Sequence, residues 1–207
     1  MLALFVSAFV TLFVVIDPPG CAPIFAGLVS GSSQRQALTL ALKACFIALI
    51  ILLAFALFGE KLLGALQIEL NSFRLAGGIM LFLIALDMVF ERRTQRREKQ
   101  VEKALAGHEV ENVSVFPMAI PIIAGPGSIA TVMLLMARSQ GTPATLMILA
   151  ALLAVMGLTF AALAAAKPLM ALVGAQVEAV ITRLLGVLLA ALAAQYVIDG
   201  VRTAMAR

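Results

Sequence analysis

The sequence predicts an all-α integral membrane protein whose six transmembrane helices form a 3+3 inverted repeat. The first reason is composition, because 63% of the 207 residues are hydrophobic and 13% are charged, whereas soluble domains are about half apolar and about a quarter charged. The second is a set of six apolar segments near the roughly 20 residues that a helix needs to cross a bilayer core. The third is an internal repeat with matched proline-glycine breaks. We therefore expect the first and fourth spans to be broken into half-helices.

The predicted spans cover approximately residues 2–29, 38–59, 72–90, 115–137, 142–166 and 177–198, within a single membrane domain of residues 1–207. The one long connection, 91–114, carries six of the fifteen basic residues: Arg92, Arg93, Arg96, Arg97, Lys99 and Lys103. Because basic loops stay in the cytoplasm, we expect this loop to be cytoplasmic and both termini to be extracytoplasmic. The basic residues form no face with interleaved aromatics, so we expect no nucleic-acid partner.

Four polar or glycine positions of the first half of the chain recur in the second half at one constant offset. They are Gln67, Glu69, Arg74 and Gly77 in the first copy, and Gln176, Glu178, Arg183 and Gly186 in the second. The pairs Pro19-Gly20 and Pro126-Gly127 recur at nearly the same offset. Each unit holds three spans, an odd number, so the second unit (about 115–207) is expected to be inverted in the membrane relative to the first (about 1–90).

The first break is Asp17-Pro18-Pro19-Gly20, which lies inside the first apolar span. Proline cannot continue a helix without kinking it but suits the first turn of a new one, and Asp17 is a good N-cap. We therefore expect a half-helix to end near Ile16 and another to begin near Pro18. The free donors of the new helix, which favour an anion, would be the N–H groups of Gly20, Cys21 and Ala22. The alternative is that the prolines only kink the span for packing.

Asp17 is the strongest single candidate for a functional residue. A carboxylate deep in a membrane is costly and indicates a functional site by default. We expect it to bind substrate and to exchange a proton during transport, although a function as helix cap alone stays open. The matching residue of the second unit is Ala124, so proton coupling would belong to one unit only.

The second break is Gly125-Pro126-Gly127-Ser128. It predicts one half-helix ending near Ile123 and another that presents free N–H groups and a hydroxyl. The residues expected to bind substrate here are Gly125, Gly127, Ser128, Ile129 and Thr131, although Thr131 is as well explained by a bond to its own helix backbone. Two positive helix ends that face free carbonyl groups suit a small zwitterion such as an amino acid.

Arg74 and Arg183 open the third and sixth spans on opposite sides of the membrane. They either extend to the membrane interface or act as gates by pairing with Glu69 and Glu178. Both readings stay open at this stage.

No metal site, cofactor or enzymatic site is expected. Cys21 and Cys45 fall in apolar segments without a neighbouring cysteine or histidine cluster, so we expect them to pack as small hydrophobic residues. Asp17 is the only carboxylate securely at depth, and the single histidine, His108, lies in the charged loop. A nucleophile and base deep in the membrane are therefore not indicated.

Both breaks carry a recognisable pattern. Asp17-Pro18-x-Gly20-x-x-Pro23-x-Phe25 and Pro121-x-x-x-Gly125-Pro126-Gly127-x-Ile129-x-Thr131 resemble the two signatures of the MarC family of bacterial inner-membrane proteins. The length, the six spans and the long basic loop are also similar, so the resemblance covers essentially the whole chain. That family is also called a neutral amino acid transporter family and is grouped distantly with LysE-type exporters. The resemblance therefore implies an inner-membrane location and transport of a small solute.

Together these observations predict a secondary transporter of small neutral amino acids, similar to glycine or alanine, and coupled to protons. No Walker A pattern is present, so this chain is not expected to drive transport by its own ATP hydrolysis. The alternatives are an exporter of an inorganic ion or another small solute, and a membrane protein that does not transport. The sequence leaves the oligomeric state open.

Overall fold

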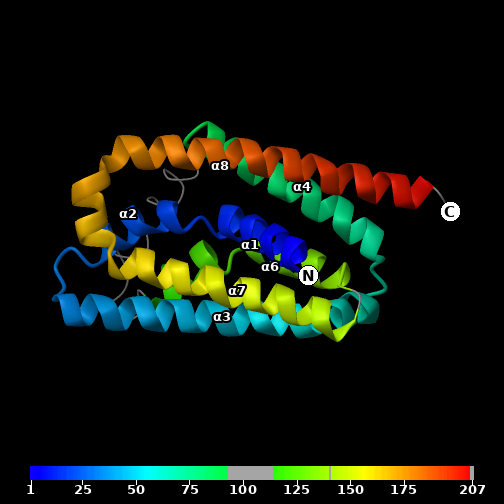
Figure 1. The fold of residues 1–207 in the computed structure, drawn as a ribbon, viewed down its shortest axis with the longest axis horizontal. Coiled ribbons are helices and arrows are strands. Elements are labelled where there is room, and N and C mark those ends of the chain that lie inside the picture. The colour runs from blue at the N-terminus through cyan, green and yellow to red at the C-terminus, as the bar shows by residue number, and fades with distance from the viewer. Residues whose placement is uncertain (93–113, 140, 206–207) are drawn as a thin grey trace.

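The computed structural model describes residues 1–92, 114–139 and 141–205, and every regular element in these ranges is a helix. The helices are α1 (Leu2–Ile16), α2 (Pro18–Leu28), α3 (Gln34–Ala65), α4 (Leu70–Val89), α6 (Pro126–Ala137), α7 (Thr142–Ala164) and α8 (Ala166–Met205), shown in Figure 1. An irregular segment, Ser114–Ile123, precedes α6.

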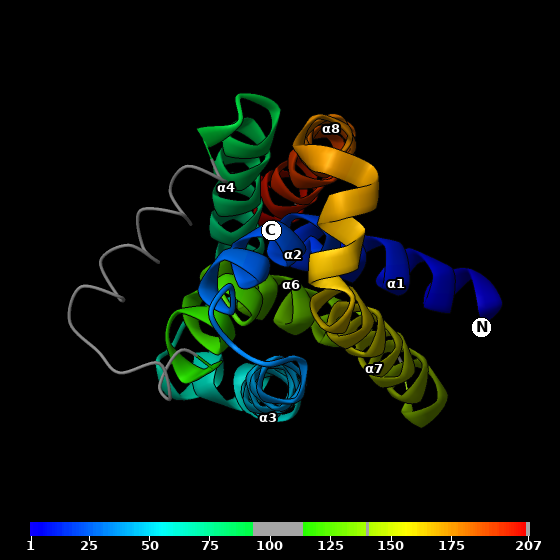
Figure 2. The same ribbon diagram turned by 90° about the vertical axis from the view of Figure 1, so that its left-hand side faces the viewer.

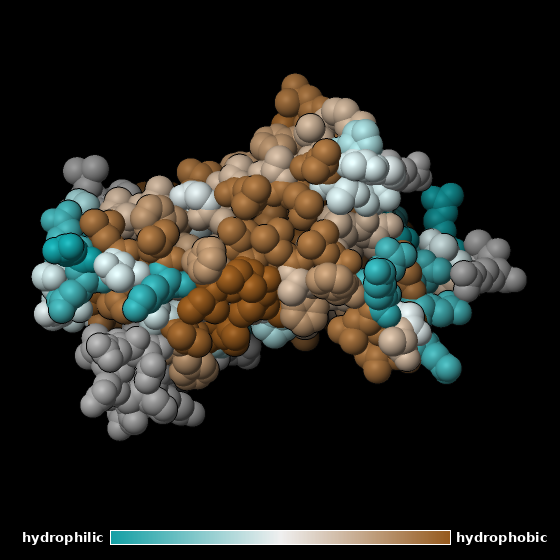
Figure 3. All heavy atoms as spheres, turned by 90° about the horizontal axis from the view of Figure 1, so that it is seen from below, coloured by the Kyte–Doolittle hydropathy of each residue, from teal (hydrophilic) through white to brown (hydrophobic). Residues whose placement is uncertain are grey.

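Five stretches of the described chain are long and apolar enough to cross a membrane, and a sixth is added if Ser114–Ile123 and α6, which meet at a bend of 53°, form one span. Figure 3 shows an apolar belt between two polar ends on the face in view. The chain is therefore an integral, multi-pass membrane protein. The expected fold class is confirmed at the level of an all-helical membrane protein with five or six spans.

The helices lie in three layers, as the end-on view in Figure 2 shows. Helices α4 and α8 form one outer layer, α3 and α7 form the other, and the short helices α1, α2 and α6 lie between them. Two clusters of buried apolar side chains fill the interior, one shared by α1, α2, α3 and α7 and one between α4, α8, α1 and α6. Both proline-glycine breaks thus lie in the central layer.

The first break occurs where the sequence predicts it. Helix α1 ends at Ile16 and α2 begins at Pro18, with Asp17 between them in the left-handed conformation (φ 61°, ψ 65°). Aspartate is one of the few residues other than glycine that adopt this conformation readily. Pro18 and Pro19 occupy the first two positions of α2, where the absence of an N–H group costs nothing.

The half-helix expected to end near Ile123 is not confirmed as a regular helix. Within Ser114–Ile123 the backbone is extended at Phe116 (φ −130°, ψ 125°) and at Ile120 (φ −127°, ψ 126°). Each of these residues directly precedes a proline, Pro117 or Pro121, and proline disfavours the helical conformation of the residue before it. The fourth apolar segment is therefore regular only from Pro126 onward.

Helix α8 is longer than the predicted sixth span, 177–198, because it begins at Ala166 directly after α7 and continues to Met205. Its 40 residues exceed the roughly 20 that cross a bilayer core. In Figure 1 its first turns run across one end of the bundle before the helix turns back alongside α4. At that end the Lys167 ammonium group donates to the Ser32 carbonyl oxygen at 3.0 Å.

Helices α4 and α8 pack closely and antiparallel through glycines. A Cβ atom built on Gly78 would lie 2.9 Å from Val197, and one built on Gly186 would lie 2.8 Å from Met88. Residues early in α4 thus contact residues late in α8, and the reverse. Small residues allow such close backbone approach between membrane helices.

Replacing Gly78 by alanine should lower the thermal unfolding midpoint. The added Cβ would lie 2.9 Å from the Val197 backbone nitrogen and 3.0 Å from the Ala193 carbonyl oxygen, so one helix must shift. Overpacking of this kind costs about 1–3 kcal/mol. Gly157→Ala in α7 is the matched control, because nothing lies within 4 Å of a Cβ built there. Equal midpoints for both variants would contradict the close contact between α4 and α8.

Candidate substrate-binding site

The two breaks adjoin each other in the central layer. A Cβ atom built on Gly127 would lie 3.6 Å from Cγ1 of Val15, which is two residues before Asp17. Apolar residues beside both breaks belong to one core cluster, which includes Ile16, Cys21, Ala22, Ile123 and Ala124. The fold therefore brings together two segments that lie in different halves of the chain.

The polar groups at the breaks are closed off from solvent. The exposed fractions of Asp17, Ser128 and Thr131 are 1%, 3% and 0%. The remaining predicted site residues are also buried, apart from half-buried Ile129: they are Gly20, Cys21, Ala22, Gly125 and Gly127. These residues are small, so a group bound here would meet backbone rather than long side chains.

Asp17 caps α2, as the sequence predicts. Its Oδ1 atom accepts a hydrogen bond from the Gly20 N–H at 3.2 Å, and its carbonyl oxygen accepts one from the Cys21 N–H at 3.0 Å. The expectation that Gly20 and Cys21 present free N–H groups is therefore wrong. The physical reason is that the two prolines supply no N–H, so the donors of the first turn begin at Gly20, within reach of the Asp17 carboxylate.

The first turn of α6 differs from that of α2. Its N-cap is Gly125, which has no side chain to cap the helix, whereas the N-cap of α2 is Asp17. The Ile129 N–H donates to the Gly125 carbonyl oxygen at 3.0 Å, so the expectation of a free N–H group at Ile129 is also wrong. By helix geometry, the N–H groups of Gly127 and Ser128 have no partner within α6, and Pro126 has no N–H group.

Thr131 lies one turn further along α6 and is completely buried. Its Oγ1 atom has no hydrogen-bond partner among the described residues. The alternative that it bonds to its own helix backbone is therefore not realised. Thr159 in α7, equally buried, does form that bond, with its Oγ1 donating to the Val155 carbonyl oxygen at 2.8 Å.

Comparison with known proteins identifies the relatives of this chain. Residues 2–205 match the model of the MarC family integral membrane proteins. The chain belongs to the MarC family. It is 35% identical to the UPF0056 membrane protein MJ1677 of Methanocaldococcus jannaschii, over 97% of each chain. It is 33% identical to the UPF0056 inner membrane protein YhgN of Escherichia coli, over 95% of each chain. No solved structure matches.

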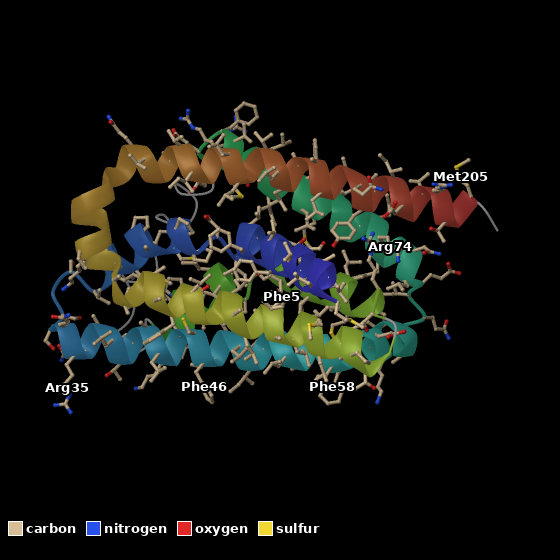
Figure 4. The ribbon with its side chains drawn as sticks, in the orientation of Figure 1. Phe5, Arg35, Phe46, Phe58, Arg74 and Met205 are labelled. Carbon is tan, nitrogen blue, oxygen red and sulfur yellow. The ribbon has the colours of Figure 1, made fainter. Side chains whose placement is uncertain are left out.

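The two arginines expected as gates lie at opposite ends of this MarC protein. Arg183 forms an ion pair with Glu91, which follows the end of α4, whereas the side chain of its expected partner Glu178 lies outside the described residues. Arg74 lies near the end that also holds Met205, far from Arg35 in Figure 4. Its Nε atom is buried without a hydrogen-bond partner in the described chain. Gating by either arginine stays a prediction.

Sequence reasoning missed a cluster that ties α6 to α8. Arg138, at the end of α6, forms a 2.7 Å ion pair with Asp199 and stacks over the Tyr196 ring at 4.6 Å from its centre. Gln195 donates to the other Asp199 carboxylate oxygen at 2.8 Å. The repeat relates Glu91 to a position beside Asp199, but it gives no signal for Arg138 as the partner. Both ion pairs, Arg183 with Glu91 and Arg138 with Asp199, include a residue of α8. Their acidic residues occupy nearly corresponding positions in the sequence repeat.

The two cysteines, Cys21 and Cys45, are reduced thiols buried in the core, as expected for small hydrophobic residues. Cys21 Sγ donates weakly to the Ile16 carbonyl oxygen at 3.5 Å. That carbonyl, one of those expected to face a substrate, is thus partly occupied by the thiol.

Gly20→Ala should break the cap of α2, because a Cβ at this position would collide with the Asp17 carboxylate. Loss of a capping bond costs about 0.5–2 kcal/mol, so the thermal unfolding midpoint should fall. Gly27→Ala is the control in the same helix, since nothing lies within 4 Å of a Cβ built there. If both variants unfold at the same temperature, Asp17 does not hold α2 as described.

Proposed function

We propose that this protein is a secondary transporter of small neutral amino acids, coupled to protons through Asp17. The observation that carries the proposal is the pairing of two unlike helix starts at one buried place. One start holds a carboxylate that is 1% exposed, and the other holds uncapped backbone donors. A carboxylate suits an ammonium group and a helix N-terminus suits an anion, so the pair suits a small zwitterion.

The inverted repeat belongs to the same proposal. Gly186 meets Met88, and Gly78 meets Val197. At the repeat offset, Gly186 corresponds to Gly77, and Met88 corresponds to Val197. The counterpart of the contact between Gly186 and Met88 is therefore Gly77 with Val197, directly beside the contact between Gly78 and Val197. Such reciprocal contacts are expected when two inverted units pack around a two-fold axis between α4 and α8. In this arrangement the first and fourth spans are the discontinuous ones, and their breaks meet at the interface.

The size of the residues at the breaks supports a small substrate. Glycine, alanine and cysteine make up five of the nine residues predicted to bind substrate, and all five are buried. A substrate of the size of glycine or alanine would displace few buried side chains. A large side chain would have to displace buried residues such as Phe25, which is 1% exposed.

The proposed location is the bacterial inner membrane, where the relative YhgN is named as an inner membrane protein. The loop 91–114 would lie in the cytoplasm and both termini outside it. Arg35 and Met205 lie at opposite ends of the bundle in Figure 4. This separation agrees with a cytoplasmic start of α3 and an extracytoplasmic C-terminus.

The proposal is tested by reconstituting the purified protein in proteoliposomes. Flux of radiolabelled glycine and alanine is measured with and without an imposed pH gradient, and empty liposomes give the background. We expect protein-dependent flux that the gradient drives to accumulation. Absence of flux for every neutral amino acid under both conditions would exclude the proposed function.

Asp17→Asn should abolish accumulation driven by the pH gradient while exchange of substrate across the membrane persists. Asparagine is also a good N-cap, so it can keep the bond to the Gly20 N–H and the fold, but it carries no charge and binds no proton. Glu60→Gln, at an exposed position of α3, is the matched control and should transport like the native protein. Unchanged accumulation by Asp17→Asn would remove Asp17 from the coupling step.

A further inference from the structure

The two helix starts at the site are not equivalent as places for an anion. The Asp17 side chain already accepts from the first available N–H of α2, and its ionised form would repel a second carboxylate. The first turn of α6 has neither an acidic residue nor a side-chain cap. Electrostatics therefore favours the start of α6 over the start of α2 as the place for an anion.

Thr131 supplies an observation of a different kind. A buried hydroxyl without a partner is unfavourable, and Thr131 Oγ1 is such a group among the described residues. In a helix the Cα–Cβ bond tilts toward the N-terminus, so the Thr131 side chain leans toward the first turn of α6. Ser128, three residues earlier, shares its face of the helix and is 3% exposed.

We propose that the first turn of α6 and the Thr131 hydroxyl form the carboxylate-binding half of the substrate site. The Gly127 and Ser128 N–H groups and the Thr131 and Ser128 hydroxyls donate to the carboxylate, while the ammonium group lies toward Asp17. This inference rests on the proposed function and deepens it, because it fixes the orientation of the substrate. It also defines the ligand class: a free carboxylate is required, and an amide in its place binds weakly.

The placement of this helix start between other elements supports the assignment. A Cβ built on Gly127 would lie 2.5 Å from Ile84 of α4 and 3.6 Å from Val15 of α1. The surroundings on these sides are apolar side chains, which offer the donors of the first turn no competing acceptor. Hydrogen bonds to a charged group are stronger in such an environment than in water.

The test measures ligand binding to the purified full chain in nanodiscs by the ligand-dependent shift of the unfolding midpoint. The probes are glycine, alanine, glycinamide and acetate. Thr131→Val, which removes the hydroxyl at nearly constant shape, should weaken glycine and alanine binding by about tenfold to a hundredfold, the range for a hydrogen bond to a charged group. Thr131→Ser should restore most of the affinity. Glycinamide should bind weakly to all variants.

The control is Thr159→Val, because Thr159 is equally buried but its hydroxyl is already bonded to its own helix. It should bind glycine like the native protein. Without ligand, Thr131→Val should unfold at the same temperature as the native protein or higher, since it removes a polar group that has no partner in the described chain. A purely structural function of Thr131 predicts the opposite sign.

The outcomes separate this inference from the proposed function. Amino acid binding that is unchanged in Thr131→Val, or weakened equally in Thr159→Val, overturns the inference and leaves the proposed function in place. Acetate binding that depends on Thr131, without any amino acid binding, supports the carboxylate half and excludes the proposed function. Absence of binding by glycine, alanine and acetate alike overturns the inference.

Discussion

The rest of this structure depends on one constraint: a helix that stops inside a membrane leaves backbone groups that lipid cannot satisfy. The chain meets this constraint twice, by different means. At the first break the two prolines remove two donors, and Asp17 accepts a hydrogen bond from the next one, the Gly20 N–H. The backbone at the start of α2 is thus satisfied within the chain. At the second break Pro126 removes one donor, and the uncapped first turn of α6 keeps the others. An interrupted span is tolerable at both places only because other helices surround it.

The outer layers provide that surrounding protein. Helices α4 and α8 approach closely through glycines on one side of the breaks, and α3 and α7 cover the other side. Ion pairs hold α8 at two separate places, to Glu91 after α4 and to Arg138 after α6. Both pairs are partly exposed, and exposed pairs contribute little stability, about 0–1 kcal/mol. They therefore mark where α8 meets the ends of α4 and α6 rather than determine which helices pack together.

Much of the fold and part of the site were predictable from sequence. Apolar segment lengths locate the spans, and local chemistry places Asp17 as the cap of a helix that starts at Pro18. The irregular backbone before Pro126 was missed because the expected half-helix rested on the apolar length of the segment, whereas Pro117 and Pro121 disfavour the helical conformation of the residues before them. The pairing of Arg138 with Asp199, 61 residues apart, depends on how α6 and α8 pack. Local sequence holds no signal for such a contact.

The difference between the two breaks follows from their sequences and has a functional consequence. In a symmetric pair of inverted units, equivalent positions would carry equivalent groups, and a ligand bound between them would meet the same chemistry on both sides. Here Asp17 is matched by Ala124, and the cap present at one break is absent from the other. A zwitterion is itself unlike at its two ends, so it is the ligand for which such an asymmetric pair is best suited. In the proposed arrangement, the symmetry of the scaffold brings the breaks together, and the loss of symmetry at a single residue gives the site its polarity.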